Sequence, residues 1–363
     1  MITRNYNFGA GPAMLPESIL REAQAELLDW NNTGMSVMEI GHRTPEFMSL
    51  CNHAEQTLRY LLAVPQNYQI LFLGSAGRTQ FSMIPMNLLQ PNEQAGYLDT
   101  GIWSHMALLE AQNLKKAYCI ASDALNGYTS IPAQRVWDIK ENTTYVYFTP
   151  NETINGTRFP FVPKLSEGYL VADMTSCLLT EPININDYGV IFAGAQKNIA
   201  NAGLTIVIIR NNLLERAPNP TVPSMMNYQL QAEYRSLYAT PPTFNFYIAA
   251  KMFDWIKAQG GINVLYQRTQ EKAAKIYQFL DSTDFYITRV EKEARSLVNI
   301  CFSLKDKSLE TTFLQQANQR GLYALKGHAL VGGVRASMYN SMPLSGVDAL
   351  IKFMAEFAKE NYR

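Results

Sequence analysis

Lys197 lies where a buried amine could do chemistry, between the apolar runs Gly189 to Ala195 and Leu204 to Ile209. Both runs have the length and composition of strands buried on two faces. An ammonium at the end of such a strand loses hydration, which lowers its pKa and frees the neutral amine to form a Schiff base. A surface lysine with its head in water is the ordinary alternative. The motifs around Lys197 are therefore needed to distinguish a reactive amine from a surface lysine.

The segment LFLGSAGRTQF joins a predicted strand, Tyr68 to Leu73, to a helix that begins at Arg78 or Thr79. The small residues from Gly74 to Gly77 let backbone amides approach an anion, and the helix N-terminus adds partial positive charge. The loop matches neither GxxxxGK[ST] nor GxGxxG, so it gives little support to a nucleotide-binding fold. It favours a phosphate site, with a tight strand-to-helix turn as the alternative.

A third motif, GYLVADMTS, puts Asp173 at the carboxyl end of a predicted strand, where open α/β sheets bind ligands. Its carboxylate could hold the N–H of a pyridinium ring, although an acid at this place can also cap a helix. A phosphate loop at Gly77, an acid at Asp173 and an amine at Lys197 are together the parts that pyridoxal phosphate requires. The sequence therefore predicts pyridoxal 5'-phosphate as cofactor.

Short apolar strands alternate with helical stretches through the first two thirds of the chain, which is typical of a mostly parallel α/β sheet. Strands are predicted at Tyr68 to Leu73, Ala95 to Asp99, Tyr145 to Phe148, Tyr169 to Ala172, Val190 to Ala193 and Leu204 to Ile209. Helices are predicted at Pro16 to Trp30, Thr79 to Leu89, Ala249 to Gln259 and Gly261 to about Leu280.

The length of 363 residues exceeds what one core usually fills, and the Gly260-Gly261 pair is a strong break. We expect a large cofactor-binding domain over residues 16–260 and a small C-terminal α/β domain over 261–363, joined by the N-terminal segment 1–15. In the small domain, strands are predicted at Tyr286 to Val290, Leu297 to Phe302 and Gly332 to Ser337, and helices at Ser308 to Arg320 and Ser345 to Glu360.

Charge and cysteine content limit the classes of partner. Lys plus Arg equals Asp plus Glu at 31 each, so neither nucleic acid nor an anionic membrane is expected, and the partners should be small molecules or protein. The four cysteines are scattered, and with four His and no HExxH motif no metal site is expected. The N-terminus has no apolar segment of the signal-peptide kind, which predicts a cytoplasmic protein.

Many long strings, in order from one end to the other, resemble the phosphoserine aminotransferases, class V enzymes of pyridoxal-phosphate fold type I. These strings are FGAGPAMLP at the start, SVMEIGHR around Arg43, GRTQF from Gly77, PNETI around Thr153, YGVIFAGAQKNIANAGLTIVI around Lys197, TPPTF from Thr240 and LKGHALVGGVRASMYN near the end. The resemblance implies the fold-type I architecture, with a large domain whose mostly parallel sheet is flanked by helices and a smaller C-terminal domain.

The resemblance also implies roles around the cofactor ring. Lys197 resembles the family's Schiff-base lysine and Asp173 the partner of the pyridine nitrogen, which makes these two the expected catalytic residues. Trp103 is similar to the aromatic residue that stacks on the ring. Thr153 and Gln196 resemble contacts to the ring hydroxyl and to the phosphate side of the cofactor.

For the cofactor phosphate, Gly77 and Arg78 correspond to the phosphate loop, in which backbone amides matter more than the Arg side chain. Thr240 resembles the position through which a second subunit reaches the phosphate, which implies a homodimer with shared active sites. The preceding Ala239 stands where the family commonly has Asn, so one side-chain contact is lost. Ser75 and Ala76 replace two glycines of the family's loop.

For the substrate, Arg335 resembles the clamp on the α-carboxylate, a bidentate task that suits arginine. His42, Arg43 and His328 resemble the side that binds the substrate phosphate. Ala329 departs from the family, which usually has Arg there, so one phosphate ligand is missing. His53 and His105, the other two His, are expected to be structural.

The implied activity is reversible amino transfer from L-glutamate to 3-phosphooxypyruvate, giving 2-oxoglutarate and O-phospho-L-serine, with formation of 4-phosphooxy-L-threonine at the same site. This places the protein in serine and pyridoxine biosynthesis. Another class V transaminase with a small 2-oxo acid substrate, such as an alanine–glyoxylate transaminase, remains an alternative. So do a cysteine desulfurase, although Cys301 lies in the strand-like NICFSL, and a Schiff-base aldolase or a non-catalytic binding protein on the same fold.

Overall fold

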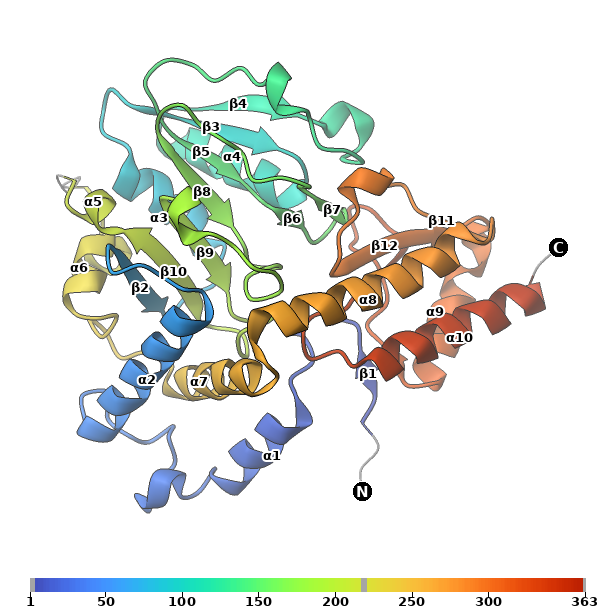
Figure 1. Cartoon of the computed structure of the whole chain (residues 1–363), viewed down its shortest axis with the longest axis horizontal. Helices are drawn as coiled ribbons and strands as arrows, with labels where there is room; N and C mark the ends of the chain where they lie inside the picture. The colour runs from blue at the N-terminus through green and yellow to red at the C-terminus, as the bar shows by residue number, and fades with distance from the viewer. Residues whose placement is uncertain (1–3, 217–220, 362–363) are drawn as a thin grey trace.

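A seven-stranded sheet forms the centre of the computed structural model, which describes residues 4–216 and 221–361 (Figure 1). The strands, in spatial order, are β2 (Tyr68–Leu73), β10 (Thr205–Arg210), β9 (Val190–Gly194), β8 (Tyr169–Asp173), β5 (Thr143–Phe148), β3 (Gln94–Asp99) and β4 (Ala117–Ser122). They run parallel except β10, which is antiparallel to both its neighbours. The predicted mostly parallel sheet is therefore confirmed.

The direction of β10 differs from a simple βαβ alternation, and the reason is the length of the connection. Only residues 195–204 separate β9 from β10, whereas a parallel crossover needs about a dozen residues or more. The chain therefore turns back beside β9, and Thr205 pairs with Gly194. This short return places Lys197 in the connection, at the carboxyl end of β9.

Helices cover both faces of the sheet. They are α1 (Glu17–Ala25), α2 (Pro45–Leu61), α3 (Thr79–Leu88), α4 (Ile102–Leu114), α5 (Asn211–Leu214), α6 (Tyr228–Glu233) and α7 (Thr243–Ala258). Buried residues of α3, α4 and α6 form one core cluster with the sheet, and those of α1, α2 and α7 form another. Along β9, Ile191 belongs to the second cluster and Phe192 to the first, so both sides of the strand are buried as expected.

The part of the chain after residue 260 builds a second, smaller α/β unit. Helix α8 (Gly261–Asp281) leads into it, followed by β11 (Tyr286–Ile287), β12 (Asn299–Leu304), α9 (Glu310–Gln319), β13 (Leu322–Tyr323), β14 (Val334–Ser337) and α10 (Leu344–Asn361). β12 pairs antiparallel with β11 and β14. In Figure 1 this unit lies to the right of the large sheet, with α8 running from one unit to the other.

Two observations bear on the predicted domain division. The N-terminal strand β1 (Tyr6–Asn7) pairs with β13, and Phe8 joins the core of the small unit. Helix α8 packs Ile262 and Leu265 in the core of the large unit and Ile276 in that of the small one. The segment 1–15 thus contacts the small unit where it is described, while a boundary at 260–261 stays a prediction because α8 belongs to both cores.

Several predicted elements have different ends, and some were missed. The helix predicted over Pro16 to Trp30 ends at Ala25, the strand predicted from Tyr286 ends at Ile287, and α7 begins at Thr243 rather than at Ala249. The missed helices and strands are α2, α4, α5, α6, β1, β4, β13 and the short hairpin of β6 (Asn151–Glu152) with β7 (Thr157–Arg158). β4 is an edge strand with several half-exposed positions, so its apolar pattern is weak.

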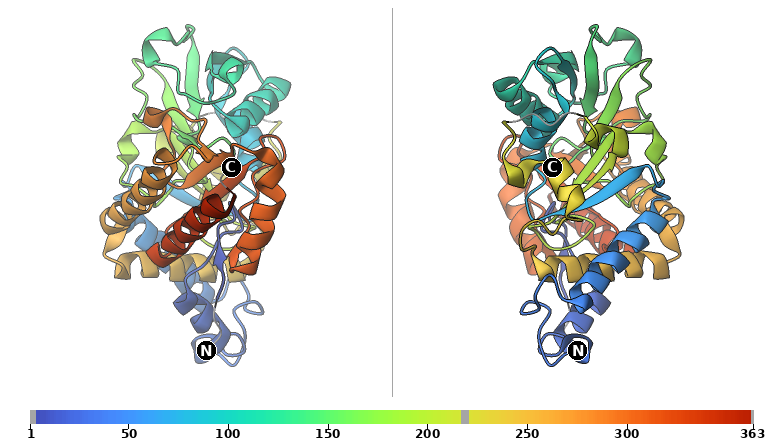
Figure 2. Two further views of the ribbon diagram at one scale, coloured as in Figure 1. Left: turned by 90° about the vertical axis from the view of Figure 1, so that its right-hand side faces the viewer. Right: turned by 90° about the vertical axis from the view of Figure 1, so that its left-hand side faces the viewer.

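The N-terminal helix α1, drawn in blue, forms the lower end of the molecule in both views of Figure 2. Apolar side chains in and after this helix are exposed, with Leu28 at 85% and Met38 at 55%. None of the helices in the described ranges is long and apolar enough to cross a membrane.

The small unit should depend on its aromatic core. Phe313 is fully buried and its ring contacts those of Phe302, Phe353 and Phe357. We expect Phe313→Ala to lower the free energy of unfolding by about 3–5 kcal/mol, because it removes buried apolar surface and leaves a cavity. Chemical denaturation followed by circular dichroism measures the loss. The control is Phe161→Ala, at a side chain that is 37% exposed; equal losses in the two variants would contradict the prediction.

Candidate active site

Lys197 lies at the carboxyl ends of the central strands, in a cavity of about 290 Å³. The residue is only 8% exposed, and its Nζ donates a hydrogen bond to Thr153 Oγ1. β8 ends at Asp173 beside Phe192 of β9, so the acid comes to the same edge of the sheet. The cavity brings together seven residues predicted from the sequence, which are Gly77, Arg78, Trp103, Thr153, Asp173, Gln196 and Lys197.

Burial governs the protonation of the two central groups. Burial is the main reason that the pKa of Lys197 is lowered to about 8; the Asp173 carboxylate opposes this shift, and the nearby Arg335 adds to it. Burial also raises the pKa of Asp173, against a hydrogen bond that its Oδ1 accepts from Thr175 N at 2.9 Å. Asp173 therefore both caps the following turn and faces the cavity, so the two interpretations of this acid are compatible. A lysine with a pKa near 8 is partly neutral at physiological pH, as a nucleophilic amine requires.

The loop between β2 and α3 is shaped for an anion. Within the described residues, the backbone N–H groups of Gly77 and Arg78 have no hydrogen-bond acceptor. A Cβ at Gly77 would lie 3.2 Å from Gly194 N and 3.3 Å from Thr175 Oγ1, so a side chain there would crowd the loop against β9. The Arg78 guanidinium lies over the Trp103 ring, 5.3 Å from its centroid, and leaves the amides open. This geometry fits a phosphate held by backbone amides.

Trp103 is held at the start of α4 by a buried acid that the sequence analysis missed. Glu152 accepts hydrogen bonds from Trp103 N at 3.0 Å and from Ser104 N at 2.8 Å, and burial raises its pKa to about 7. Glycine is required at position 101, because a Cβ there would lie 2.3 Å from Glu152 Cδ. Glu152 stands in the quoted string PNETI, but nothing local in that string shows that its carboxylate reaches a helix 49 residues earlier.

Polar atoms left without a partner also point to a ligand. Trp103 Nε1 and Thr149 Oγ1 are buried and have no hydrogen-bond partner among the described residues. Both residues line the cavity, and such atoms are normally satisfied in a complete structure. An aromatic face, an acid, an amine, open amides and unsatisfied donors together fit pyridoxal phosphate.

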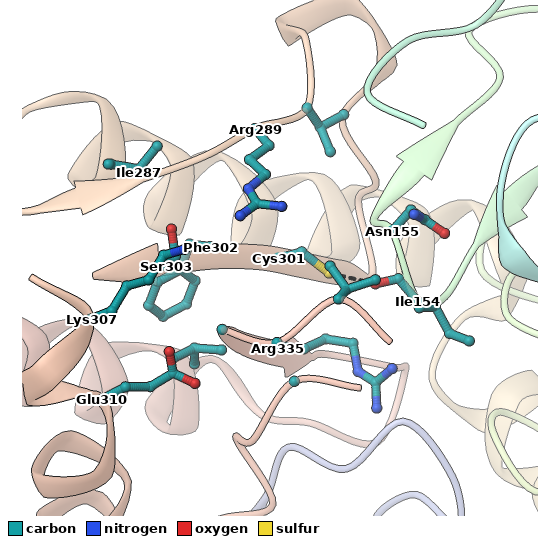
Figure 3. Close-up of a pocket in the computed structure, with 16 residues that line it drawn as sticks. Ile154, Asn155, Ile287, Arg289, Cys301, Phe302, Ser303, Lys307, Glu310 and Arg335 are labelled. Atoms are coloured by element: carbon teal, nitrogen blue, oxygen red, sulfur yellow. Dashed lines mark hydrogen bonds between the residues drawn. The ribbon is translucent and has the colours of Figure 1, made fainter. Parts of the chain in front are cut away.

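Arg335 does not line this cavity; it lines a second one of about 170 Å³, which residues of the small unit form together with Ile154 and Asn155. Its Nη1 is 3.5 Å from the Thr153 carbonyl oxygen to which it donates. Figure 3 shows the second cavity, with the Arg335 guanidinium pointing away from Lys307 and Glu310. Arg335 thus reaches from β14 toward the turn between β6 and β7 that carries Thr153, whose hydroxyl contacts Lys197.

Besides Arg335, five predicted residues do not line the Lys197 cavity of their own chain: His42, Arg43, Ala239, Thr240 and His328. Arg43 and Thr240 are exposed. His42 has a buried Nε2 with no partner among the described residues, and His328 Nδ1 accepts a hydrogen bond from Leu330 N at 3.3 Å. Their binding roles stay predictions.

Comparisons with known proteins agree with this geometry. A family model described as aminotransferase class-V matches residues 5–350, which makes the chain a class V aminotransferase. A curated relative from Legionella pneumophila (strain Lens), named phosphoserine aminotransferase, is 66% identical over 99% of this chain and all of its own length. The chain belongs to the phosphoserine aminotransferase family.

Solved structures give the same result. One, a study of radiation damage of the Schiff base in phosphoserine aminotransferase, has a TM-score of 0.97 at 41% identity and covers 99% of this chain and all of that one. Another, phosphoserine aminotransferase from Trichomonas vaginalis with bound pyridoxal phosphate, has a TM-score of 0.94 at 39% identity, covering 97% of this chain and all of that one. The predicted fold-type I architecture is confirmed.

The raised pKa of Glu152 makes folding depend on pH. Ionisation of this carboxyl group is disfavoured in the folded state, so the stability it provides at low pH is lost as the pH rises from about 4.5 to about 7. The free energy of unfolding of the native protein minus that of Glu152→Gln should therefore fall by roughly 2 kcal/mol between pH 5 and pH 8. Urea denaturation of both proteins at the two pH values measures this. Parallel pH curves would show that Glu152 is already ionised at pH 5.

Proposed function

We propose that the protein is a pyridoxal-phosphate-dependent phosphoserine transaminase, which moves the amino group of L-glutamate to 3-phosphooxypyruvate and gives O-phospho-L-serine and 2-oxoglutarate. The observation that carries the proposal is the buried Lys197 amine with Asp173 and the open amides of Gly77 and Arg78 around one cavity. Family membership supports the same reaction. The longer phosphorylated 2-oxo acid that leads to 4-phosphooxy-L-threonine presents the same two anionic ends, and we propose it as a second substrate.

When bound, the cofactor supplies an aldehyde for the amine and a conjugated ring that accepts the electrons left at the substrate Cα. The chain supplies the orientation. The amides of Gly77 and Arg78 would bind the phosphate, and the Trp103 ring would pack against the pyridine ring. Asp173 would hold a proton at the ring nitrogen, while Thr153 and Gln196 would bind the ring hydroxyl and the phosphate side.

Lys197 moves the proton. Its neutral Nζ would take the proton from the substrate Cα and hold it for its return during the amino transfer. Burial suits Nζ to this, because a pKa of about 8 lets it bind and release a proton near neutral pH. The hydrogen bond to Thr153 Oγ1 fixes the direction of the amine.

The substrate carries an anionic group at each end, a carboxylate and a phosphate, and each needs a cationic partner. We propose that Arg335 binds the α-carboxylate, since its guanidinium already lies beside Thr153. His42, Arg43 and His328 would bind the substrate phosphate, without help from Ala329. Because His42 and Arg43 lie outside the cavity of their own chain, they serve best in a homodimer, where they face the cavity of the other copy.

Exposed apolar residues support the homodimer. They gather in the segment that precedes His42, and are Leu20, Leu27, Leu28, Met35 and Met38. Burying them against a second copy would remove apolar surface from water, and Ala239 and Thr240 would reach the partner's cofactor phosphate from the same interface. We also propose a cytoplasmic location, where the free thiols Cys51, Cys119, Cys177 and Cys301 stay reduced.

A desulfurase is disfavoured by the state of Cys301. This thiol lies in β12, hydrogen-bonds to the Ile154 carbonyl oxygen at 3.5 Å, and lines the second cavity rather than that of Lys197. Burial raises its pKa to about 12, so it is not the thiolate that desulfuration needs. A small-substrate transaminase would have no use for the cationic set at His42, Arg43 and His328.

The first test is Lys197→Ala in the full-length protein with added pyridoxal phosphate. We expect loss of the visible absorbance of lysine-bound cofactor and a fall in kcat of at least about 10³-fold, because the change removes both the attachment and the proton carrier. The control is Lys164→Ala at an exposed site. Borohydride reduction and mass spectrometry should locate the cofactor on Lys197 in the native protein. Cofactor found on another lysine would overturn the assignment.

The second test concerns the substrate phosphate. Single-turnover spectra should show much faster reaction with 3-phosphooxypyruvate than with the unphosphorylated 2-oxo acid. Arg43→Ala should lower kcat/KM for the phosphorylated acid by about 10- to 100-fold, as expected for a lost charge-assisted contact. Arg21→Ala, which breaks an exposed ion pair with Glu17, is the control. Equal rates with both acids would exclude a phosphate site.

A further inference from the structure

Lys272 is a buried lysine that lies outside the proposed catalytic machinery. It belongs to α8, is 3% exposed, and within the described residues forms no ion pair with a carboxylate. Its Nζ instead donates to three backbone carbonyl oxygens, those of Met338 at 3.2 Å, Tyr339 at 2.8 Å and Met342 at 3.2 Å. The ammonium has three N–H donors, so all of them are used. Lysine is rarely buried unless it is paired, which suggests a specific task.

The three carbonyl groups belong to one segment, residues 338–342, between β14 and α10. The turn in it is closed by a single backbone hydrogen bond, from Met342 N to Tyr339 O at 3.0 Å. Carbonyl groups directed at one buried point repel one another unless a donor lies there, and unpaired buried carbonyls are costly. The ammonium of Lys272 therefore sets the conformation of this segment.

The same segment contacts the loop that carries Lys197. The Asn340 N–H donates to Asn198 Oδ1 at 3.1 Å, and Asn340 Nδ2 donates to the Leu179 carbonyl oxygen at 2.8 Å. Asn198 directly follows Lys197. The segment held by Lys272 thus touches the large unit one residue away from the reactive amine.

A second chain of hydrogen bonds leads from this segment to the cavity. Asn299 Nδ2 donates to Tyr339 OH at 3.1 Å, and Asn151 Nδ2 donates to Asn299 Oδ1 at 2.8 Å. Asn151 lines the cavity. On the other side, Arg335 lies in β14, which ends one residue before the segment begins. A shift of residues 338–342 would therefore move the loop that carries Lys197, Asn151 in the cavity wall, and Arg335.

We propose that Lys272 is a positioning residue for the transamination site, which acts by holding the carbonyls of 338–342 so that Asn340 fixes the Lys197 loop and β14 aims Arg335. The proposal rests on the proposed function. It differs from an ordinary packing role because the contacts made by this segment lead to the reactive amine and to the substrate clamp. Misplacement by about 1 Å in such a site can reduce the rate by up to about 10²-fold.

The test uses Lys272→Met in the full chain with pyridoxal phosphate, because Met keeps much of the side-chain volume and removes the donors. We expect kcat/KM for L-glutamate to fall about tenfold or more, while the cofactor still binds Lys197 and gives its visible absorbance. The matched control is Lys275→Met on the same helix, whose lysine forms an exposed ion pair with Asp348 and should leave kcat/KM unchanged. A purely structural role would lower the midpoint of thermal unfolding but leave kcat/KM, measured well below that midpoint, within twofold of the native value; that result overturns the proposal.

Asn340→Ala removes a contact between the same segment and the large unit. It tests the proposal even if Lys272→Met does not fold. We expect a fall in kcat/KM in the same direction, and the double variant should lose less than the sum of the two single losses in free energy, because both act through one segment. A native kcat/KM in Asn340→Ala overturns the proposal. If the native protein itself shows no lysine-bound cofactor and no transamination, the proposed function fails as well, so the two failures are distinguishable.

Discussion

The removal of the Lys197 amine from water is the interaction on which the rest of the site depends. Desolvation is the largest influence on its pKa, and it is only partly offset by Asp173. Were the amine solvated, it would be almost fully protonated at neutral pH and could neither attack an aldehyde nor accept a proton. The surrounding structure keeps water away from the Lys197 amine but leaves the amine accessible to a ligand in the cavity.

The sheet produces this position by simple geometry. β8 and β9 are parallel, so their carboxyl ends bring Asp173 and the residues after Gly194 to one edge. β10 then returns at once beside β9 and closes the loop on itself. The N-terminal segment covers the loop from outside, since Ala13 N donates to the Gln196 carbonyl oxygen at 2.9 Å. Because both sheet faces are buried, the cavity lies at this edge, and the side chains of Asp173, Gln196 and Lys197 line it.

Sequence reasoning succeeded where one strand and its end carry the information. Continuous apolar runs predicted β2, β8, β9 and β10, and the positions at or after the ends of β8 and β9 predicted Asp173 and Lys197, while Trp103, Thr153 and Gln196 were predicted from the family resemblance. It failed where a partner lies far along the chain, as for Glu152 under Trp103, whose role depends on two segments meeting in space. It also missed half-exposed elements such as β4. The roles predicted for His42, Arg43 and Thr240 stay predictions, and the one predicted for Thr240 needs a second copy of the chain.

The two buried lysines show how similar desolvation leads to opposite uses. Burial lowers the pKa of Lys272 to about 7 and that of Lys197 to about 8. Lys272 donates hydrogen bonds to three backbone carbonyl oxygens, which hold both its amine and the surrounding segment in place. Lys197 has a single hydroxyl partner and open space beside it, so its amine can leave that partner and react. Reactivity here therefore follows from incomplete hydrogen bonding in a dry cavity more than from burial alone, and the saturated lysine supplies the rigidity that an unsaturated one cannot.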